Sequence, residues 1–330
     1  MKLSRWTRNP GKLWLGIFGA GLFFGIFAAA LDAAETSMRR VLIAHAAVSL
    51  TQVPVLYGID SGLYQREGID LKFVIMRTDL AIKAMISGDV GYTYTAASAL
   101  RAAAGGIPVR VVAFTIVRSL FYLMAGPNVT NPDQLKGKAV GMNVFGSADE
   151  VAARTGLKHL GLDPARDVTL LALGPPSTRL AALKSGVVAA AVMPLPWNLR
   201  MRAEGFRQLL DISTLVDQPT TGIGATVDRI RQRPDEIKAV LRGLLASFGA
   251  MRTHRNEVAL VIQKNFKLPP EMATQVYEAL LPAISSDGRS SESGIMNVVR
   301  DAAAGTGVNR AVSLADVVDY RLLDAVQRGE

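Results

Sequence analysis

Short β-branched runs alternate with segments of helical spacing along most of the chain, and this alternation constrains the fold more than any other feature. Arg40–Ala44 has the character of a strand, Pro54–Ser61 that of a helix ended by Gly62, and Leu71–Ile75 that of the next strand. Strand–helix–strand units of this kind favour a mostly parallel sheet covered by helices. The sequence therefore predicts an α/β fold.

The same alternation continues to about residue 115 and starts again after Gly126–Pro127, which predicts two sheets of similar size. From about Pro234 onward the spacing is helical, so we expect a helical C-terminal part. The other predicted strands cover residues 90–93, 109–115, 135–142, 168–173, 187–193 and 207–210. The other predicted helices cover residues 78–87, 96–104, 147–160, 178–184, 197–204, 234–254, 257–265, 270–281, 291–303 and 314–326.

The N-terminal segment has the layout of an export signal. Basic residues occur up to Lys12, no charged residue lies between Leu13 and Leu31, and small residues follow up to Ala34. This order is typical of a secretory signal peptide. The apolar run of 19 residues is also long enough for a membrane span, so a retained anchor is the alternative and a buried helix the third interpretation. We expect residues 1–34 to be a signal or anchor and the remainder to be periplasmic.

Composition excludes several kinds of site. Cysteine is absent, and His45, His159 and His254 are too far apart in the sequence to suggest a zinc site. The formal charge is +9, of which residues 1–34 contribute +3, and no basic cluster is interleaved with aromatic residues. We therefore expect no metal, no cofactor and no nucleic-acid partner.

Four motifs follow one another along the predicted α/β part. They are Pro54–Leu71 (PVLYGIDSGLYQREGIDL), Ala84–Gly91 (AMISGDVG), Leu135–Gly141 (LKGKAVG) with Gly146 and Ser147 after it, and Leu180–Gly186 (LAALKSG) ahead of Pro194. The closing Asp319–Tyr320 fits the same order. Together these motifs resemble the periplasmic substrate-binding proteins of ABC importers, in the branch for sulfonates, nitrate, taurine and thiamine precursors.

This resemblance covers about residues 40–325 and implies a two-lobed periplasmic-binding-protein fold of type II, with a ligand cleft between the lobes. Residues 39–124 and 216–330, with the C-terminal helices, are expected to form lobe I, and residues 125–215 lobe II. The hinge is expected near Met124–Pro127 and Leu215–Thr221. The implied molecule is a monomer whose partners are a small ligand and an ABC permease in the membrane.

In such a fold the ligand lies where strands end and helices begin. Ser49 offers a hydroxyl there, or else it is a helix N-cap. Asn143, Gly146 and Ser147 open a helix whose positive end suits an anion, with a plain cap as the alternative. Arg118 is a bidentate anion clamp if it faces the cleft rather than solvent. The predicted ligand-binding residues are Ser49, Thr93, Tyr94, Thr115, Arg118, Asn143, Gly146, Ser147, Pro194, Trp197 and Thr221.

Three ring side chains near the predicted cleft have their own interpretations. Tyr94 is placed to stack on a ligand. Trp197 either forms a wall of the cleft or packs between the lobes. His45 ends the first strand and is the histidine that we expect nearest to the ligand.

The function implied by the resemblance is capture of a small anionic or heteroaromatic solute and its delivery to an ABC importer by hinge closure. A membrane-tethered sensory or scaffold receptor of the same fold is the alternative, because the apolar N-terminal run is long. We do not expect an enzyme, since the sequence shows neither paired catalytic carboxylates nor a serine–histidine–acid pattern.

Overall fold

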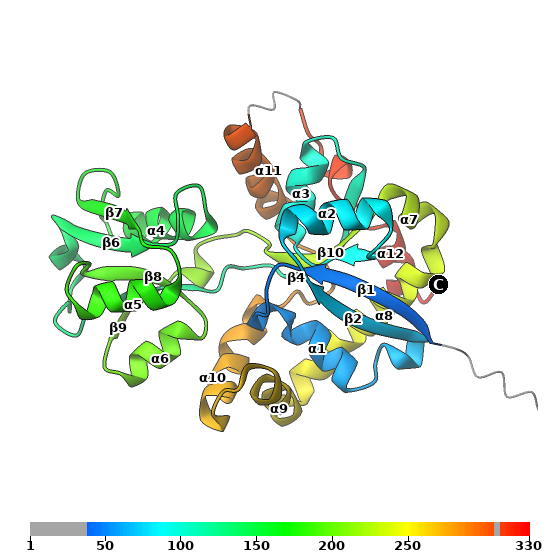
Figure 1. Ribbon diagram of the computed structural model, residues 1–330, viewed down its shortest axis with the longest axis horizontal. Helices are drawn as coiled ribbons and strands as arrows, with labels where there is room; N and C mark the ends of the chain where they lie inside the picture. The colour runs from blue at the N-terminus through cyan, green and yellow to red at the C-terminus, as the bar shows by residue number, and fades with distance from the viewer. Residues whose placement is uncertain (1–37, 307–310) are drawn as a thin grey trace, which may run out of the picture. The chain divides into compact units, whose positions relative to one another are not determined.

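The computed structural model of the protein describes residues 38–306 and 311–330. It contains two five-stranded sheets, each covered by helices (Figure 1). The α/β fold predicted from the sequence is therefore confirmed. The predicted signal or anchor, residues 1–34, lies outside the described residues. Within residues 38–306 and 311–330, no helix combines the length and the apolar character that crossing a membrane requires.

The first sheet is built from strands at both ends of the described chain. The order is β2-β1-β3-β10-β4, so β10, from the C-terminal half of the chain, is an interior strand between β3 and β4. β1 is parallel to β2 and β3, whereas β10 is antiparallel to β3 and β4. The strands are β1 (Arg39–His45), β2 (Ile69–Ile75), β3 (Tyr92–Thr93), β4 (Val109–Ile116) and β10 (Thr221–Thr226).

The second sheet is formed by the middle of the chain in the order β7-β6-β8-β5-β9. β6 is parallel to β7 and β8, and β5 is antiparallel to β8 and β9. The strands are β5 (Phe121–Ala125), β6 (Lys138–Met142), β7 (Val168–Ala172), β8 (Ala190–Pro194) and β9 (Arg207–Asp211).

The expectation of mostly parallel sheets is wrong, because the sequence pattern does not predict β5 or β10. β5 lies directly before Gly126–Pro127 and overlaps the hinge that is predicted near Met124–Pro127. Since β5 pairs with β8 and β9, the chain crosses between the sheets at residues 117–120 instead. It returns over residues 212–220, close to the predicted second crossover.

β10 escapes prediction because two of its six residues are glycine, which normally weakens a strand. Both glycines are required by close packing. A Cβ on Gly222 would collide with the carbonyl of Ala113, and a Cβ on Gly224 would lie 2.8 Å from Cγ2 of Thr93. Strand β10 therefore fits between β3 and β4 only where side chains are missing.

Most helices lie where the 3.6-residue spacing predicts them, with three corrections. A short helix at Val227–Gln232 is not predicted. α5 begins at Pro176, ahead of the predicted start at residue 178, because proline is tolerated in a first helical turn. The predicted helix at 314–326 is divided, because Val318 forms a bridge with Val111 of β4. The helices are α1 (Val53–Asp60), α2 (Thr78–Ser87), α3 (Ala96–Ala104), α4 (Ala148–His159), α5 (Pro176–Lys184), α6 (Trp197–Ala203), α7 (Val227–Gln232), α8 (Pro234–Thr253), α9 (Arg255–Phe266), α10 (Pro270–Leu280), α11 (Glu292–Thr306) and α12 (Arg321–Gln327).

The helices form apolar layers on the faces of the sheets. In the first sheet, one face shares an apolar core with α1, α8, α9 and α10, and the other face shares a core with α2, α3 and α11. In the second sheet, α4 packs on one face and α5 with α6 on the other. The strand ends that carry the polar residues of the candidate site are thus held between helices.

A buried carboxylate joins four elements at the starting edge of the first sheet. Glu236 of α8 has a side chain that is 1% exposed. Its Oε1 accepts hydrogen bonds from the Tyr92 hydroxyl at 2.9 Å and from Nε of Arg229 at 3.0 Å. Arg39 of β1 and Arg233 each place a guanidinium nitrogen 3.5 Å from its Oε2. These contacts connect β1, β3, α7 and α8.

We predict that Glu236→Gln lowers the free energy of unfolding by about 3 kcal/mol, because it leaves a partly buried arginine without its counter-charge. The control is Asp235→Asn, one position earlier on α8, where the side chain is 89% exposed. That change should cost less than about 0.5 kcal/mol. Urea denaturation followed by circular dichroism measures both. Equal effects of the two substitutions would contradict the structural role of Glu236.

Candidate ligand-binding site

The first sheet brings several predicted site residues together at one edge. β1 and β3 end there at His45 and Thr93, and β10 begins beside them. The amide of Gly222 donates to the carbonyl of Tyr94 at 3.0 Å, which fixes the start of β10 against the end of β3. Ser49 lies just beyond β1, so the edge collects polar side chains from three separate segments.

His45 is the centre of the polar contacts at this edge. Its Nε2 lies 3.2 Å from Oγ of Ser49, and its Nδ1 lies 3.4 Å from Oγ1 of Thr95. The ring packs edge-on against Tyr94 with centroids 5.2 Å apart, and it also contacts the ring of Phe73. Burial lowers the pKa of His45 to about 4, so the ring is neutral at neutral pH.

The His45–Ser49 pair has the residue types of a nucleophile and its base, but its chemistry does not favour catalysis. A base is most effective when its pKa lies near the working pH, and burial places that of His45 near 4. The Ser49 hydroxyl is also 2.7 Å from Oγ1 of Thr51. These contacts are suited to fixing the direction of the Ser49 hydroxyl for a bound ligand.

Four other predicted site residues of the first sheet are buried. Thr93, Tyr94 and Thr115 are 0% exposed, and Thr221 is 3% exposed. The Tyr94 hydroxyl donates to the carbonyl of Thr51 at 2.8 Å, and burial raises the pKa of Tyr94. Oγ1 of Thr115 and Oγ1 of Thr221 lie 2.7 Å apart. These side chains form a layer beneath the half-buried Ser49, and Val48 beside it is 65% exposed.

In the second sheet, Asn143 follows β6 and is half-buried. Ser147 takes the N-cap position of α4, but its hydroxyl donates to the carbonyl of Val144 at 2.6 Å. The Gly146 amide donates to Oε2 of Glu150 at 2.7 Å, and this hydrogen bond holds the pKa of Glu150 below its usual value. The Glu150 carboxylate therefore competes with any ligand anion for the positive end of α4.

A buried ion pair fixes the helices behind this edge. Nη1 of Arg179 on α5 donates to Oδ1 of Asp149 on α4 at 2.6 Å, and it also donates to the carbonyl of Val192 in β8. Arg179 is 2% exposed and Asp149 is 7% exposed. The N-terminal parts of α4 and α5 are thus joined to each other and to the sheet.

Pro194 and Trp197 lie at the carboxyl end of β8 and the start of α6. Trp197 is half-buried against the apolar core, and the guanidinium of Arg200 lies 5.5 Å from the centre of its ring. A ring with this partial exposure is compatible with both of its predicted roles, packing and contact with a ligand.

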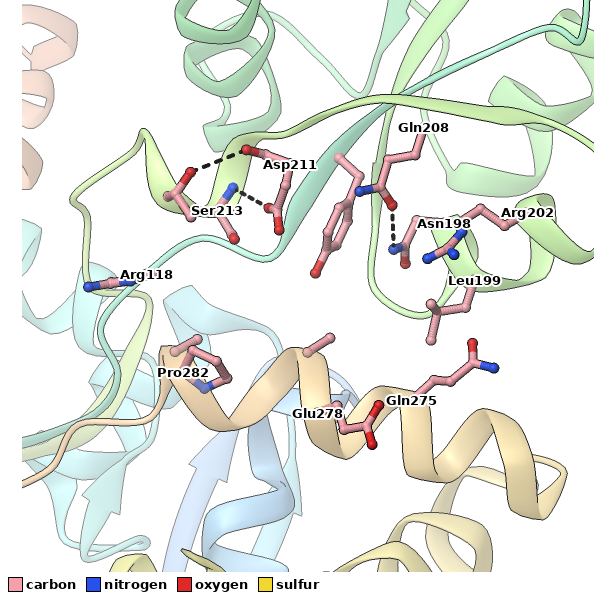
Figure 2. A pocket seen from close by; sticks show the side chains of 14 residues that line it. Arg118, Asn198, Leu199, Arg202, Gln208, Asp211, Ser213, Gln275, Glu278 and Pro282 are labelled. Carbon is pink, nitrogen blue, oxygen red and sulfur yellow. Dashed lines mark hydrogen bonds between the residues drawn. The ribbon is translucent and has the colours of Figure 1, made fainter.

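A cavity of about 470 Å³ lies between α6, β9 and α10 (Figure 2). Of the eleven predicted site residues, only Arg118 lines it. No sequence pattern indicates the other lining residues, because they come from three segments about 80 residues apart. The lining residues are Arg118, Tyr122, Asn198, Leu199, Arg202, Gln208, Asp211, Ser213, Thr214, Gln275, Glu278, Ala279, Pro282 and Ala283.

The described part of the chain contains no group of three or more histidine, aspartate or glutamate residues placed to hold a metal ion. The polar side chains at the strand ends are mainly hydroxyls and amides. Such groups bind by hydrogen bonding, and they can orient a small molecule without changing it.

We predict that His45 makes the stability of the protein fall with acidification. Its pKa is about 4 in the folded protein and 6.5 in an unfolded chain, so protons bind the unfolded chain more readily. The contribution of neutral His45 is complete above about pH 6.5 and is lost as the pH falls to about 4. The gap corresponds to about 3 kcal/mol.

The measurement is the free energy of unfolding at pH 7 and pH 4.5, from urea denaturation of the wild type and of His45→Gln. The wild type should lose about 2–3 kcal/mol more than the variant over this range, since the carboxylates are common to both. His159→Gln, which changes an exposed histidine, should retain the wild-type dependence. Parallel curves for wild type and His45→Gln would refute the assignment.

Comparison with solved structures shows what the fold is similar to. The periplasmic aliphatic sulphonate-binding protein SsuA from Escherichia coli matches with a TM-score of 0.69 and 17% identity, over 85% of this chain and 92% of SsuA. The periplasmic nitrate-binding protein NrtA from Synechocystis PCC 6803 matches with a TM-score of 0.64 and 16% identity, over 89% of each chain. The predicted periplasmic-binding-protein fold is confirmed.

An enzyme shares this fold. The desulfurization enzyme DszB matches with a TM-score of 0.65 and 15% identity, over 88% of this chain and 99% of DszB. At such low identity these likenesses show the fold and not the activity. The comparison with curated proteins finds no match. A family model described as NMT1/THI5 like matches residues 50–258, well over half of the chain, and the chain therefore belongs to the NMT1/THI5-like family.

Proposed function

We propose that this protein captures a small organic anion outside the cytoplasmic membrane and delivers it to an ABC importer. The observation that carries the proposal is the gathering of hydroxyl, amide and ring side chains at the strand ends of both sheets, with exposed apolar residues beside them. His45 contacts both Ser49 and Tyr94 at the first edge. Asn143 and Ser147 lie at the corresponding strand end of the second sheet, between β6 and α4.

The exposed apolar residues favour a solute that has an apolar part as well as an anionic group. Val48 is 65% exposed directly before Ser49, and Val144 and Phe145 are 50% and 59% exposed between Asn143 and Ser147. Apolar side chains exposed next to polar ones are typical of a ligand-binding surface. An alkyl or aromatic sulfonate or carboxylate matches this combination better than nitrate does.

Within residues 38–306 and 311–330, two chain segments join the two sheets, residues 117–120 and 212–220. Hinge closure requires a connection of this kind. We propose that the two lobes predicted from the sequence close about these segments when solute binds. The permease of an ABC importer would then receive the closed, loaded form. The proposed location outside the membrane rests on the basic and apolar pattern of residues 1–34.

A membrane-tethered receptor of the same fold is the second candidate, favoured by the uncharged run of 19 residues at the N-terminus. The two candidates differ in the fate of that run. N-terminal sequencing of the protein produced in a bacterial host decides between them. A start between residues 31 and 35 supports a free binding protein, and retention of residue 1 in the membrane fraction supports a receptor.

We predict that one class among alkyl sulfonates, aromatic sulfonates, carboxylates, nitrate and heteroaromatic solutes raises the melting temperature of the purified protein. A ligand at 100 times its Kd adds about 2.7 kcal/mol to the stability, which corresponds to a shift of a few degrees. Differential scanning fluorimetry measures the shift. No shift with any of these solutes at millimolar concentration would remove the proposed cargo class.

We predict further that Ser49→Ala and Asn143→Ala each weaken binding of the identified solute about tenfold, because each removes one hydrogen bond to it. Ser185→Ala and Asn256→Ala make the same chemical changes at exposed positions away from both edges and should leave Kd unchanged. Isothermal titration calorimetry measures all four. Unchanged affinity in the first two variants would place the solute elsewhere.

A further inference from the structure

The cavity between α6, β9 and α10 shares no lining residue with the strand-end site, which comprises His45, Ser49, Tyr94, Asn143 and Ser147. The polar groups of the cavity have unused binding capacity. Asn198 is 1% exposed, and its side-chain nitrogen donates to Oε1 of Gln208 at 3.4 Å. Its Oδ1 is buried and has no hydrogen-bond partner among the described residues. A buried carbonyl oxygen without a partner is unfavourable, so a hydrogen-bond donor from a ligand is favourable at this place.

Two arginines line the same cavity with their charges uncompensated. Across residues 38–306 and 311–330, neither Arg118 nor Arg202 forms a hydrogen bond through its guanidinium or an ion pair. Glu278, by contrast, is paired with Arg255. Asp211 uses its Oδ1 to accept from the Ser213 amide at 2.9 Å. Asp211 forms no ion pair among the described residues, so the lining offers an anion two unpaired arginines against one unpaired carboxylate.

The spacing of two of these groups on α6 sets the geometry of a ligand. Asn198 and Arg202 are four residues apart on one helix, so they lie on the same face about 6 Å from each other. Figure 2 shows both at one end of the cavity, together with Leu199. One end thus presents a hydrogen-bond acceptor and a cation side by side.

The rest of the lining supplies an apolar surface. Leu199 of α6 and three residues of the α10 segment, Ala279, Pro282 and Ala283, line the cavity. The volume of about 470 Å³ lies within the range of small-molecule sites. An apolar side chain can occupy this surface while a polar head contacts α6.

From this arrangement we infer a second binding site, separate from the strand-end site, for an α-amino acid with an apolar side chain. The ligand carboxylate pairs with Arg202, and the ligand ammonium donates to Oδ1 of Asn198. The side chain lies against Leu199 and the end of α10. Because α6 packs on the second sheet and α10 on the first, a ligand here bridges the elements that the two crossovers connect.

The test uses two probes that differ only in the ammonium group, L-phenylalanine and 3-phenylpropanoate. Isothermal titration calorimetry should show that phenylalanine binds the wild type at least tenfold more tightly. Asn198→Leu should reduce phenylalanine to the affinity of 3-phenylpropanoate. Arg202→Gln should weaken both probes about tenfold. Arg166→Gln, which removes the same charge from a side chain that is 87% exposed, should change neither.

Equal affinity for the two probes, absence of phenylalanine binding, or binding unaffected by Asn198→Leu and Arg202→Gln would overturn the inference. Arg202 is exposed, so its variant reports on binding even if Asn198→Leu is unstable. Displacement of phenylalanine by the solute of the strand-end site, with loss of binding in Ser49→Ala, would also overturn it. The proposed function is tested separately by the solute panel and by Ser49→Ala and Asn143→Ala, so failure of this inference leaves it standing.

Discussion

The architecture depends on one tight insertion, the placing of β10 between β3 and β4. The chain can return from the second sheet into the middle of the first only because Gly222 and Gly224 leave room for the neighbouring backbone and for Thr93. Because β10 returns to the first sheet, the chain crosses between the two sheets twice, at residues 117–120 and at residues 212–220. It also sets Thr221 against Thr115, so a packing constraint far along the sequence completes the layer of hydroxyl groups beneath the candidate site.

The two edges of the first sheet at which strands start and end differ in their charged groups. At the starting edge, arginines surround the buried Glu236 and compensate its charge. At the opposite edge, burial keeps His45 neutral, and its contacts are hydrogen bonds to hydroxyl groups. The charge cluster around Glu236 stabilises the fold at the edge where no ligand is expected. The edge that faces the proposed solute has neutral groups, and their hydrogen bonds can be exchanged for hydrogen bonds to water or ligand.

Sequence reasoning succeeded where local chemistry determines the structure. The helices α2 and α3 end at glycines and have the predicted bounds, and the four sequence motifs indicate the correct family. It failed where tertiary packing determines the structure. The glycines of β10 normally argue against a strand, and only contact with β3 and β4 explains them.

The candidate site, like the fold, is predicted only in part by the sequence. The pattern of strand ends places Ser49 and Tyr94 among the predicted site residues, and both contact His45. No pattern predicts that Glu150 takes the Gly146 amide, because that hydrogen bond depends on the loop conformation. The residues of the α6–α10 cavity are distant in sequence, and only the folded chain brings them together.

The distance between Glu236 and His45 affects which substitutions the protein can accept during evolution. Arg39 begins β1 and His45 ends it, so the stabilising charge cluster and the polar edge stand about 20 Å apart along one strand. Substitutions at that distance are nearly independent in their effects on stability. New solute specificities can therefore arise in the loops after β1, β3 and β6 without weakening the part of the molecule that keeps it folded.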